Sequence, residues 1–430
     1  MRLNKILSGT LIAATCISLC ACGNNNNANS DGNNSNSGNN GTISVSIWDN
    51  NQLAGLKEIT DDFTAETGIP VDIQVVPWDQ YWTTLEAGVM GGELPDVFWM
   101  HSNYSQMYMD NGVLLDLTDR IAESDMINLD NYYKEITELY QLDGKTYAIP
   151  KDYDTIALWY NKKMFDEAGI AYPDETWTWQ TLADAAKKLT KEDGSQYGFA
   201  LPAGFTQDGY YNLIYDMGGY ILSEDKTKSG WDDPKTIDAM NWLYDNVVSV
   251  SMPSQQIMGE TTPDVLFNSG KVAMIMQGSW MVASMKQNEY ALENGDVAVL
   301  PMADDGTRIS ICNGLGWAAS AQGDNTENAW KLLEYFGSEK AQKKQAELGV
   351  TMSAYTGTSE TWINCAPEFN LQAYLDMTEN MVLRPYTRET KAWEDYSQET
   401  MKKAYTGENT MEEVCRDIAA FMNQCIAEEN

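Results

Sequence analysis

The 430-residue chain carries a formal net charge of −35, with 28 Lys and Arg against 63 Asp and Glu. So acidic a chain does not suit nucleic acid or an anionic lipid surface, because both carry negative charge themselves. A zinc site of the usual Cys/His kind is also disfavoured, because the chain has a single His and no C-x-x-C pair beyond residue 22. We therefore expect neither a metal nor a cofactor.

The N-terminus has the pattern of a secretory leader. Two basic residues precede an apolar run at 6–19, which is shorter than the roughly 20 residues that span a bilayer. The run ends in Leu-Cys-Ala-Cys-Gly, which resembles a bacterial lipobox with Cys22 as the lipidated residue. We expect a signal peptide at 1–22 and a protein anchored by lipid to the cell membrane, facing outside the cytoplasm. An ordinary signal peptide with incidental cysteines is the alternative.

The segment that follows is predicted to be a disordered tether at 23–41. Ten of the seventeen residues from 24 to 40 are Asn, and nearly all the others are Ser or Gly. Such a tract has almost no apolar surface to bury and cannot offset the entropy of ordering its backbone. It predicts a flexible leash between the anchor and a folded body.

Strands and helices alternate along the first part of that body. Apolar residues with a period of two predict strands, and those with a helical period predict helices. The predicted strands cover 43–47, 71–76 and 96–100, and the predicted helices cover 53–66, 81–89 and 104–111. The alternating order predicts an α/β fold with an open parallel sheet covered by helices on both faces.

The remainder of the chain is long enough for a second domain. Further strands are predicted at 144–150, 156–160, 197–201, 272–276, 296–300 and 315–320, and helices at 162–168, 179–190, 325–336 and within 392–426. Thr178 is the expected N-cap of the helix at 179–190. The sequence contains no internal repeat.

Ligands of open α/β sheets bind beyond the carboxyl ends of the strands. This rule points to Trp48, Asp49 and Asn50 after the first strand, and to His101 after the third. An aromatic ring there can stack on a flat ligand face, and polar groups can bridge hydroxyls. The alternatives are a core role for the Trp, helix capping for Asp49 and Asn50, and simple packing for His101.

Five segments, in order along the chain, resemble the family 1 extracellular solute-binding proteins, the group that includes maltose-binding protein. They are Trp48 with Glu66-Thr-Gly-Ile-Pro-Val, Gly92-Glu-Leu-Pro-Asp-Val-Phe-Trp-Met-His, Gly144-Lys-Thr-Tyr-Ala-Ile-Pro with Tyr160-Asn-Lys-Lys-Met-Phe-Asp-Glu-Ala-Gly, Lys271-Val-Ala-Met-Ile-Met-Gln-Gly-Ser-Trp, and Gly314-Leu-Gly-Trp-Ala-Ala-Ser. Each segment is weak alone, but together they are specific to the family and not to one sugar.

The resemblance implies two α/β lobes of the type II periplasmic-binding-protein kind, joined by hinge segments, with the ligand held between them. The expected lobes are 42–152 with 306–355 and 156–302 with 358–430. The hinge crossings are expected near 151–156, near 303–306 and near Tyr355. Such a receptor closes on its ligand by hinge motion.

The resemblance also implies roles for residues outside the strand-end positions. Asp154 stands at a hinge position where the family often carries a ligand-facing carboxylate, and Trp280 stands where family members often stack a sugar. Further candidates come from the residues themselves: Tyr153 beside Asp154, Tyr210 and Tyr211 in a Gly-flanked aromatic segment, Trp317 after Gly314-Leu-Gly, and Arg384 and Trp393 at either side of the last aromatic cluster. Each aromatic residue among them has a core role as its alternative. Ser102 and Asn103 replace the acidic and basic residues of maltose-type receptors, which argues against maltodextrin specificity.

The expected function is therefore capture of a mono- or oligosaccharide and its delivery to an ABC-type sugar permease by a monomeric, non-enzymatic receptor. The large aromatic content, 11% of the residues, suits the C–H faces of sugars. Two alternatives remain: the same fold binding a polyamine, a peptide or an acidic ligand, and a secreted glycoside hydrolase, for which paired carboxylates suffice.

Overall fold

The computed structural model describes residues 41–429, and the chain from Gly41 onward forms one compact unit. The predicted signal peptide, the predicted lipid-bearing Cys22 and residues 23–40 of the predicted tether lie outside the described residues. Within the described range, no helix combines the length and the apolar character needed to cross a membrane.

A five-stranded sheet with the order β2-β1-β3-β12-β6 forms the centre of the first lobe. Its strands are β1 (Ile43–Ile47), β2 (Val71–Val75), β3 (Val97–Met100), β6 (Ala148–Pro150) and β12 (Gly316–Ala319). β1 pairs in parallel with β2 and β3, whereas β12 runs antiparallel to β3 and β6. The sheet is therefore mixed and not wholly parallel, because β12 belongs to a segment that returns after the second lobe has been built.

Helices cover this sheet, and their ends follow from the sequence. In α1 (Leu53–Thr67), Leu56, Ile59 and Phe63 are buried on one face, and Gly68 ends the helix with a φ of 73°, which only glycine adopts without strain. The other first-lobe elements are η1 (Asn50–Gln52), α2 (Trp78–Gly91), α3 (Ser102–Asp110), α4 (Thr118–Ala122), η2 (Leu129–Asn131), α5 (Lys134–Glu138), β4 (Gln141–Leu142), β5 (Lys145–Thr146), α15 (Thr326–Phe336), α16 (Glu339–Glu347) and η6 (Ser359–Cys365).

A four-stranded sheet with the order β10-β7-β9-β8 forms the centre of the second lobe. Its strands are β7 (Ile156–Asn161), β8 (Tyr197–Ala200), β9 (Val272–Gly278) and β10 (Gly295–Ala298). β7 is antiparallel to both of its neighbours, and β8 is parallel to β9. Every residue of β7 and β9 is buried, as expected for central strands covered on both faces.

The second lobe is richer in helices than its sequence pattern predicts. Its elements are α6 (Lys162–Ala168), α7 (Trp179–Leu189), η3 (Thr206–Tyr210), α8 (Tyr211–Asp216), α9 (Pro234–Leu243), η4 (Tyr244–Val248), α10 (Ser249–Ser251), α11 (Gln255–Glu260), α12 (Pro263–Asn268), η5 (Ser279–Met281), α13 (Val282–Met285), α14 (Glu289–Asn294), α17 (Gln372–Asp376), η7 (Met377–Asn380), α18 (Thr390–Tyr405) and α19 (Met411–Glu429). Thr178 caps α7 as expected, accepting from the N–H of Thr181 at 3.2 Å. Helices α9 to α12 were not predicted.

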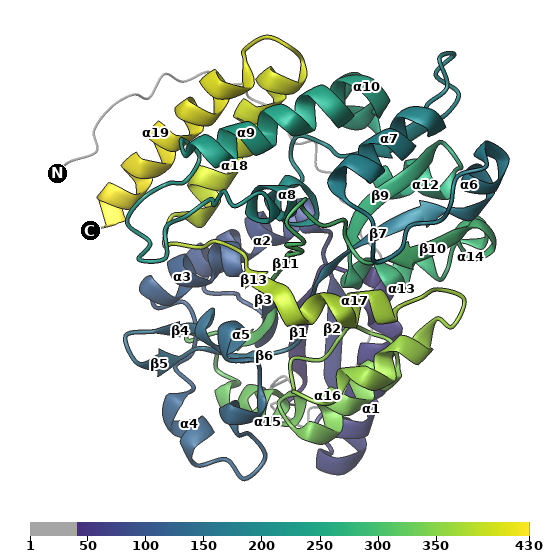
Figure 1. The fold of residues 1–430 in the computed structure, drawn as a ribbon. Coiled ribbons are helices and arrows are strands. Elements are labelled where there is room, and N and C mark those ends of the chain that lie inside the picture. Colours follow the sequence, from purple (N-terminus) through teal and green to yellow (C-terminus); the bar gives the residue numbers. More distant parts are fainter. Residues whose placement is uncertain (1–40, 430) are drawn as a thin grey trace, which may run out of the picture. The chain divides into compact units, whose positions relative to one another are not determined.

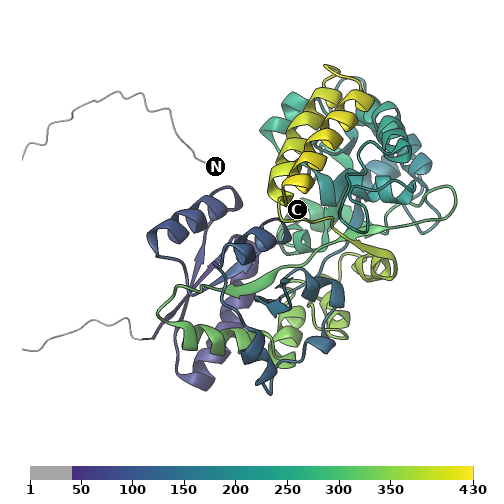
Figure 2. The same ribbon diagram turned by 90° about the vertical axis from the view of Figure 1, so that its left-hand side faces the viewer.

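Segments far apart in the sequence share a lobe. α18 and α19 pack side by side, and α19 packs on α9 (Figure 1). In the view turned by 90°, the yellow pair α18 and α19 lies among the teal helices of the second lobe, while the light-green helices α15 and α16 lie with the purple and blue first lobe (Figure 2). The chain thus enters each lobe more than once.

Three connections join the lobes, and two of them differ from the expected positions. Residues 151–155 link β6 to β7, as expected. Residues 303–306 instead form a turn closed by the Ala303 N–H and the Thr307 carbonyl at 2.8 Å, and the chain returns through β11 (Ser310–Cys312). β11 pairs in parallel with β13 (Met381–Leu383).

The third connection also lies later than expected. The ring of Tyr355 packs on that of Tyr132 at 5.3 Å, which keeps Tyr355 within the first lobe. The chain has reached the second lobe by Asn370, whose N–H donates to Asp296 Oδ1 at 2.8 Å. The crossing thus lies between Tyr355 and Asn370, after the position near Tyr355 that was expected from the resemblance.

The topology directs two sets of strand ends toward the connections. β1, β2, β3 and β6 run in one direction, so the residues after them collect at one edge of the first sheet, where β12 begins. In the second sheet, Gly278 at the end of β9 pairs with Ile156 at the start of β7. A site built from strand-end residues of both sheets therefore forms beside the connections.

Candidate functional site

An aromatic cluster stands at the carboxyl edge of the first sheet. Trp48 follows β1, and its ring centroid lies 5.1 Å from that of Trp78, 5.0 Å from Tyr81 and 4.8 Å from Trp99, all nearly edge to face. This is a favourable arrangement for aromatic quadrupoles. Trp48 is half-buried, so part of its ring supports the fold and part remains accessible.

Trp78 gives the cluster its most exposed face and was not predicted. It begins α2, just beyond the end of β2, and is 40% exposed, whereas Trp82 one turn later is 6% exposed. An indole with so much free surface contributes less to folding than its size suggests and is available to a ligand. The strand-end rule that selected Trp48 applies equally to Trp78, so the sequence did carry a signal for it.

The loop after Trp48 is held by a buried cation. Asp49 accepts from the N–H of Asn51 at 2.9 Å and from Gln52 Nε2 at 3.0 Å, so its carboxylate caps η1. Gln52 in turn accepts from Lys151 Nζ at 2.9 Å, and Lys151 is wholly buried beside Asp152. The capping alternative therefore accounts for Asp49, while Asn50 next to it is exposed.

The hinge carboxylate Asp154 joins two connections and the second lobe. Its backbone N–H donates to the Asn313 carbonyl at 2.9 Å, and its Oδ1 accepts from the Asn313 N–H at 2.8 Å. The same Oδ1 accepts from Gln207 Nε2 at 2.6 Å. Burial, together with the nearby charge of Asp152, raises the pKa of Asp154 well above its ordinary value.

His101 connects the aromatic cluster to this hinge. Its ring lies 5.4 Å from that of Trp78, and its Nε2 lies 3.0 Å from the side-chain amide of Asn313. Its Nδ1 accepts from the Asn103 N–H at 3.2 Å, which caps α3. Burial and the charge of Arg384 lower the pKa of His101 well below its ordinary value, so the imidazole is neutral.

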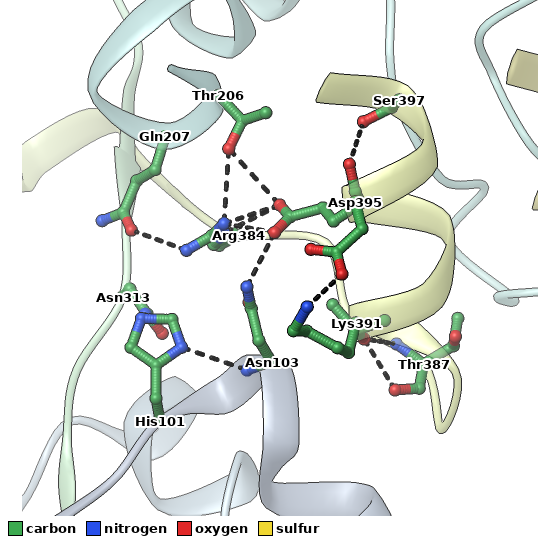
Figure 3. Close-up of polar contacts among 12 residues, drawn as sticks. His101, Asn103, Thr206, Gln207, Asn313, Arg384, Thr387, Lys391, Asp395 and Ser397 are labelled. Carbon is green, nitrogen blue, oxygen red and sulfur yellow. Dashed lines mark hydrogen bonds and ion pairs between the residues drawn. The ribbon is translucent and has the colours of Figure 1, made fainter. Parts of the chain in front are cut away.

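A buried ion pair lies on the other side of His101. Arg384 donates to both carboxylate oxygens of Glu394, at 2.6 and 2.5 Å, and the two residues are 7% and 1% exposed. Figure 3 shows the guanidinium between Thr206 and Gln207, which accept from it at 3.3 Å each. All three guanidinium nitrogens have protein partners, which favours a structural role for Arg384 over the ligand contact expected from its place beside the last aromatic cluster.

Trp280 approaches from the second lobe. It lies in η5 directly after β9, is half-buried, and packs its ring over Gly278, where a Cβ would stand 1.9 Å from the indole. Gln287, beyond α13, donates to Asn51 Oδ1 at 3.3 Å across the lobes. This contact holds the segment that carries Trp280 near the loop that follows Trp48.

Five predicted site residues are buried among other side chains. Trp317 is 1% exposed and stacks on Phe336, with ring centroids 4.2 Å apart. The others are Tyr153, Tyr210, Tyr211 and Trp393, all 0–2% exposed. Their rings fill the cores of the lobes, so the structure favours the core alternative for each of them.

A separate hollow lies on the first lobe. It has a volume of about 790 Å³ and is lined by first-lobe residues: Ser124, Asp125, Met126, Ile127, Asn128, Asn131, Ser338, Glu339, Lys340, Lys343 and Tyr355. It contains one aromatic residue and receives nothing from the second lobe or from the hinge. The strand-end cluster is the better candidate, because it brings the exposed indole of Trp78 and the half-buried indole of Trp48 together with buried polar groups.

The described residues contain no group of three or more His, Cys, Asp or Glu side chains placed to hold a metal ion. The four cysteines in the described range, Cys312, Cys365, Cys415 and Cys425, are free thiols. Burial raises the pKa of the Cys312 thiol well above its ordinary value, which makes it unreactive.

Comparisons with known proteins agree with this architecture. Residues 48–343 match the model of the family described as bacterial extracellular solute-binding protein. A galactooligosaccharide-binding protein of Bacillus subtilis is 27% identical over 350 residues, which cover 78% of this chain and 77% of that protein. A maltotriose-binding protein of Pyrococcus abyssi is 24% identical over 320 residues, covering 72% and 65%.

Solved structures show the same fold. An ABC substrate-binding protein of Listeria monocytogenes in complex with cycloalternan superimposes with a TM-score of 0.83 at 24% identity, covering 90% of this chain and 99% of that one. The GacH receptor of Streptomyces glaucescens, solved unliganded and in complex with acarbose, gives a TM-score of 0.78 at 21% identity, with the same coverage. These neighbours establish a two-lobed α/β fold, and because the family model spans more than half of the residues, the chain belongs to the bacterial extracellular solute-binding proteins.

Proposed function

We propose that this protein binds a neutral mono- or oligosaccharide between its two lobes and delivers it to an ABC-type sugar permease. The observation that carries the proposal is the pairing of the exposed indole of Trp78 and the half-buried indole of Trp48 with buried hydrogen-bonding groups at one sheet edge. Trp78 and Trp48 offer apolar faces for the C–H side of a sugar, and His101 offers a neutral polar edge beside them. The relatives named for galactooligosaccharides and maltotriose support the same ligand class.

The charges around the site favour a neutral ligand over a polyamine or an acidic sugar. The buried cations Lys151 and Arg384 are paired with Asp152 and Glu394. The raised pKa of Asp154 favours its uncharged form. A charged ligand brought to this place would lack a counter-ion and would lose its hydration.

The proposed contacts are Trp48, Trp78, Asn50, His101, Asp154 and Trp280. Asp49 positions Asn50 through the cap of η1. The protein would bind its ligand without chemical change. A glycoside hydrolase activity would contradict the receptor function. The test is hydrolysis of an aryl glycoside by the parent that is lost in Asp154→Ala.

The lobes that this function requires are proposed as 41–152 with 313–365 and 156–309 with 370–429. The lipid on Cys22 and the tether after it would keep a monomeric receptor at the outer face of the cell membrane, near its permease. Labelling with a radioactive fatty acid that is lost in Cys22→Ser tests the anchor.

A panel of mono- and oligosaccharides should raise the melting temperature of the folded unit for one sugar series. Ligand at 100 times its dissociation constant adds about 2.7 kcal/mol to the free energy of unfolding. In Trp78→Ala, binding should weaken by roughly 1.5–3 kcal/mol, the value of burying one large apolar side chain. Isothermal titration measures both affinities.

Tyr172→Ala is the matched control, because Tyr172 is 38% exposed, close to the 40% of Trp78, and packs on Tyr160 in the second lobe. It should leave the affinity for the sugar unchanged. Equal affinity of the parent and Trp78→Ala would remove Trp78 from the site. If no sugar shifts the melting temperature, polyamines and peptides become the ligands to test.

A further inference from the structure

The two lobes touch directly through α3 of the first and α18 of the second. Asn103 at the start of α3 donates from Nδ2 to Glu394 Oε2 at 2.7 Å, and this contact is buried. Glu394 is the carboxylate already paired with Arg384. Figure 3 shows Asn103 below Arg384, with its amide nitrogen directed upward. A first-lobe side chain thus completes the hydrogen bonding of a second-lobe ion pair.

Two further contacts extend this interface toward the solvent. The ammonium of Lys391, one turn before Glu394, lies 5.9 Å from the ring centroid of Tyr104. Arg388, before the start of α18, lies 3.6 Å from Asp110 at the end of α3, and both side chains are 42% exposed. Successive turns of the α18 segment therefore meet successive positions of α3 in antiparallel order.

The buried contact is the one that matters energetically. Exposed ion pairs such as Arg388–Asp110 contribute little, because water and salt screen them. A hydrogen bond to a buried charge is stronger, and its loss leaves a carboxylate oxygen short of a donor in a site of low polarity. When the lobes separate, the loss of the Asn103–Glu394 bond therefore costs more free energy than the loss of the other two contacts.

We propose that the α3–α18 contact, centred on Asn103 and Glu394, holds the lobes together before any ligand is bound. Asn103 is then a positioning residue, because it affects ligand binding only by shifting the equilibrium between the open and closed arrangements of the lobes. The contact slows ligand release, since the lobes must part for the ligand to leave. It also limits association, since the ligand enters the open form. The effect on ligand rates rests on the proposed function, whereas the effect on the ligand-free protein does not.

Asn103→Asp tests the proposal with an isosteric change. It places a carboxylate against Glu394, and the like charges should drive the lobes apart. The α3 helix itself should tolerate the change, because an acidic residue suits the first turn of a helix. Small-angle scattering of the ligand-free variant should give a larger radius of gyration than the parent, whose profile should match the structure.

Asn111→Ala is the matched control, because Asn111 carries the same amide at the exposed end of α3 and donates from it to the Met107 carbonyl within its own helix. It should scatter like the parent. Asn103→Ala, which removes a single hydrogen bond, serves as the milder second variant.

Stopped-flow binding of a sugar found in the panel provides a second readout. Asn103→Ala should raise the dissociation rate about tenfold and leave the association rate unchanged or higher, as expected for one hydrogen bond to a charged group. If Asn103 had only a local role in folding, Asn103→Ala would lower the melting temperature without raising the dissociation rate selectively. Unchanged scattering of Asn103→Asp overturns the proposal, even where sugar binding is established. Scattering that changes in a protein that binds no sugar supports it and leaves the ligand open.

Discussion

Replacing Arg384 with methionine is expected to lower the free energy of unfolding by about 3–5 kcal/mol, the cost of leaving one member of a buried ion pair without its partner. Glu394 is 1% exposed and accepts from Arg384 through both oxygens. Methionine fills a similar volume but donates no hydrogen bond. Among residues 41–429, Asn103 and Thr206 would then remain as the donors to Glu394, Thr206 at 3.4 Å.

Urea unfolding followed by tryptophan fluorescence measures this change. The double variant Arg384→Met with Glu394→Leu is the control, because removing both charges also removes the penalty and should restore most of the stability. A single variant as stable as the parent would mean that Glu394 finds water or another donor, and the ion pair would not be the centre of this region.

Asp154→Ala is expected to lower the free energy of unfolding by about 1–3 kcal/mol for each buried donor that it leaves unpaired. Those donors are the Asn313 N–H and Gln207 Nε2, both of which bond to Asp154 Oδ1. Because these bonds join two connections to the second lobe, sugar affinity should fall as well. Asp154→Asn keeps an acceptor at the same place and should retain most of the stability.

The two Asp154 variants also differ from the parent in their response to pH. The folded pKa of Asp154 is raised above its unfolded value of about 3.9, so the folded state binds the proton more tightly. The stability due to this group is fully present below about pH 3.9 and is lost as the pH rises through the folded pKa. Asp154→Asn lacks this loss, so its stability relative to the parent should increase as the pH rises from about 4 through the folded pKa of Asp154. Parallel pH curves for the two proteins would show that Asp154 stays ionised in the fold.

The sequence predicted the first lobe well because its signals are local. The alternation of Ile43–Ile47 and the helical period ending at Gly68 each lie within one short window, and the structure has β1 and α1 there. The antiparallel pairing of β12 could not be read in this way. It depends on where the chain returns after about 160 residues of second lobe, and a local pattern does not record direction.

The proposed site includes only some of the residues that the sequence suggested. Trp48, His101 and Asp154 stand at strand ends or at the hinge, where topology alone brings side chains together. Trp317 was selected because it follows Gly314-Leu-Gly, and Trp393 because it lies beside the last aromatic cluster of the sequence. A core indole and a ligand-stacking indole look alike in a sequence. Only burial separates them, at 1% and 0% exposed here.

The contact between Asn103 and Glu394 lay beyond the sequence entirely. The two residues are 291 positions apart, and nothing in either local pattern indicates the other. The resemblance marked Asn103 as a departure from maltose-type receptors. It thus drew attention to this position but did not indicate which residue Asn103 contacts. Arg384 was selected for its guanidinium, but the carboxylate that satisfies it could not be identified among 63 acidic residues.

Hydrogen–deuterium exchange of the parent, with and without the sugar found in the panel, tests most directly whether the ligand lies between the lobes. A ligand held between the lobes should slow exchange in peptides covering 48–52, 99–104, 152–155 and 278–287, which come from both lobes and the hinge. Protection confined to 124–131 and 338–343, the lining of the 790 Å³ hollow, would contradict it and move the site to one face of the first lobe.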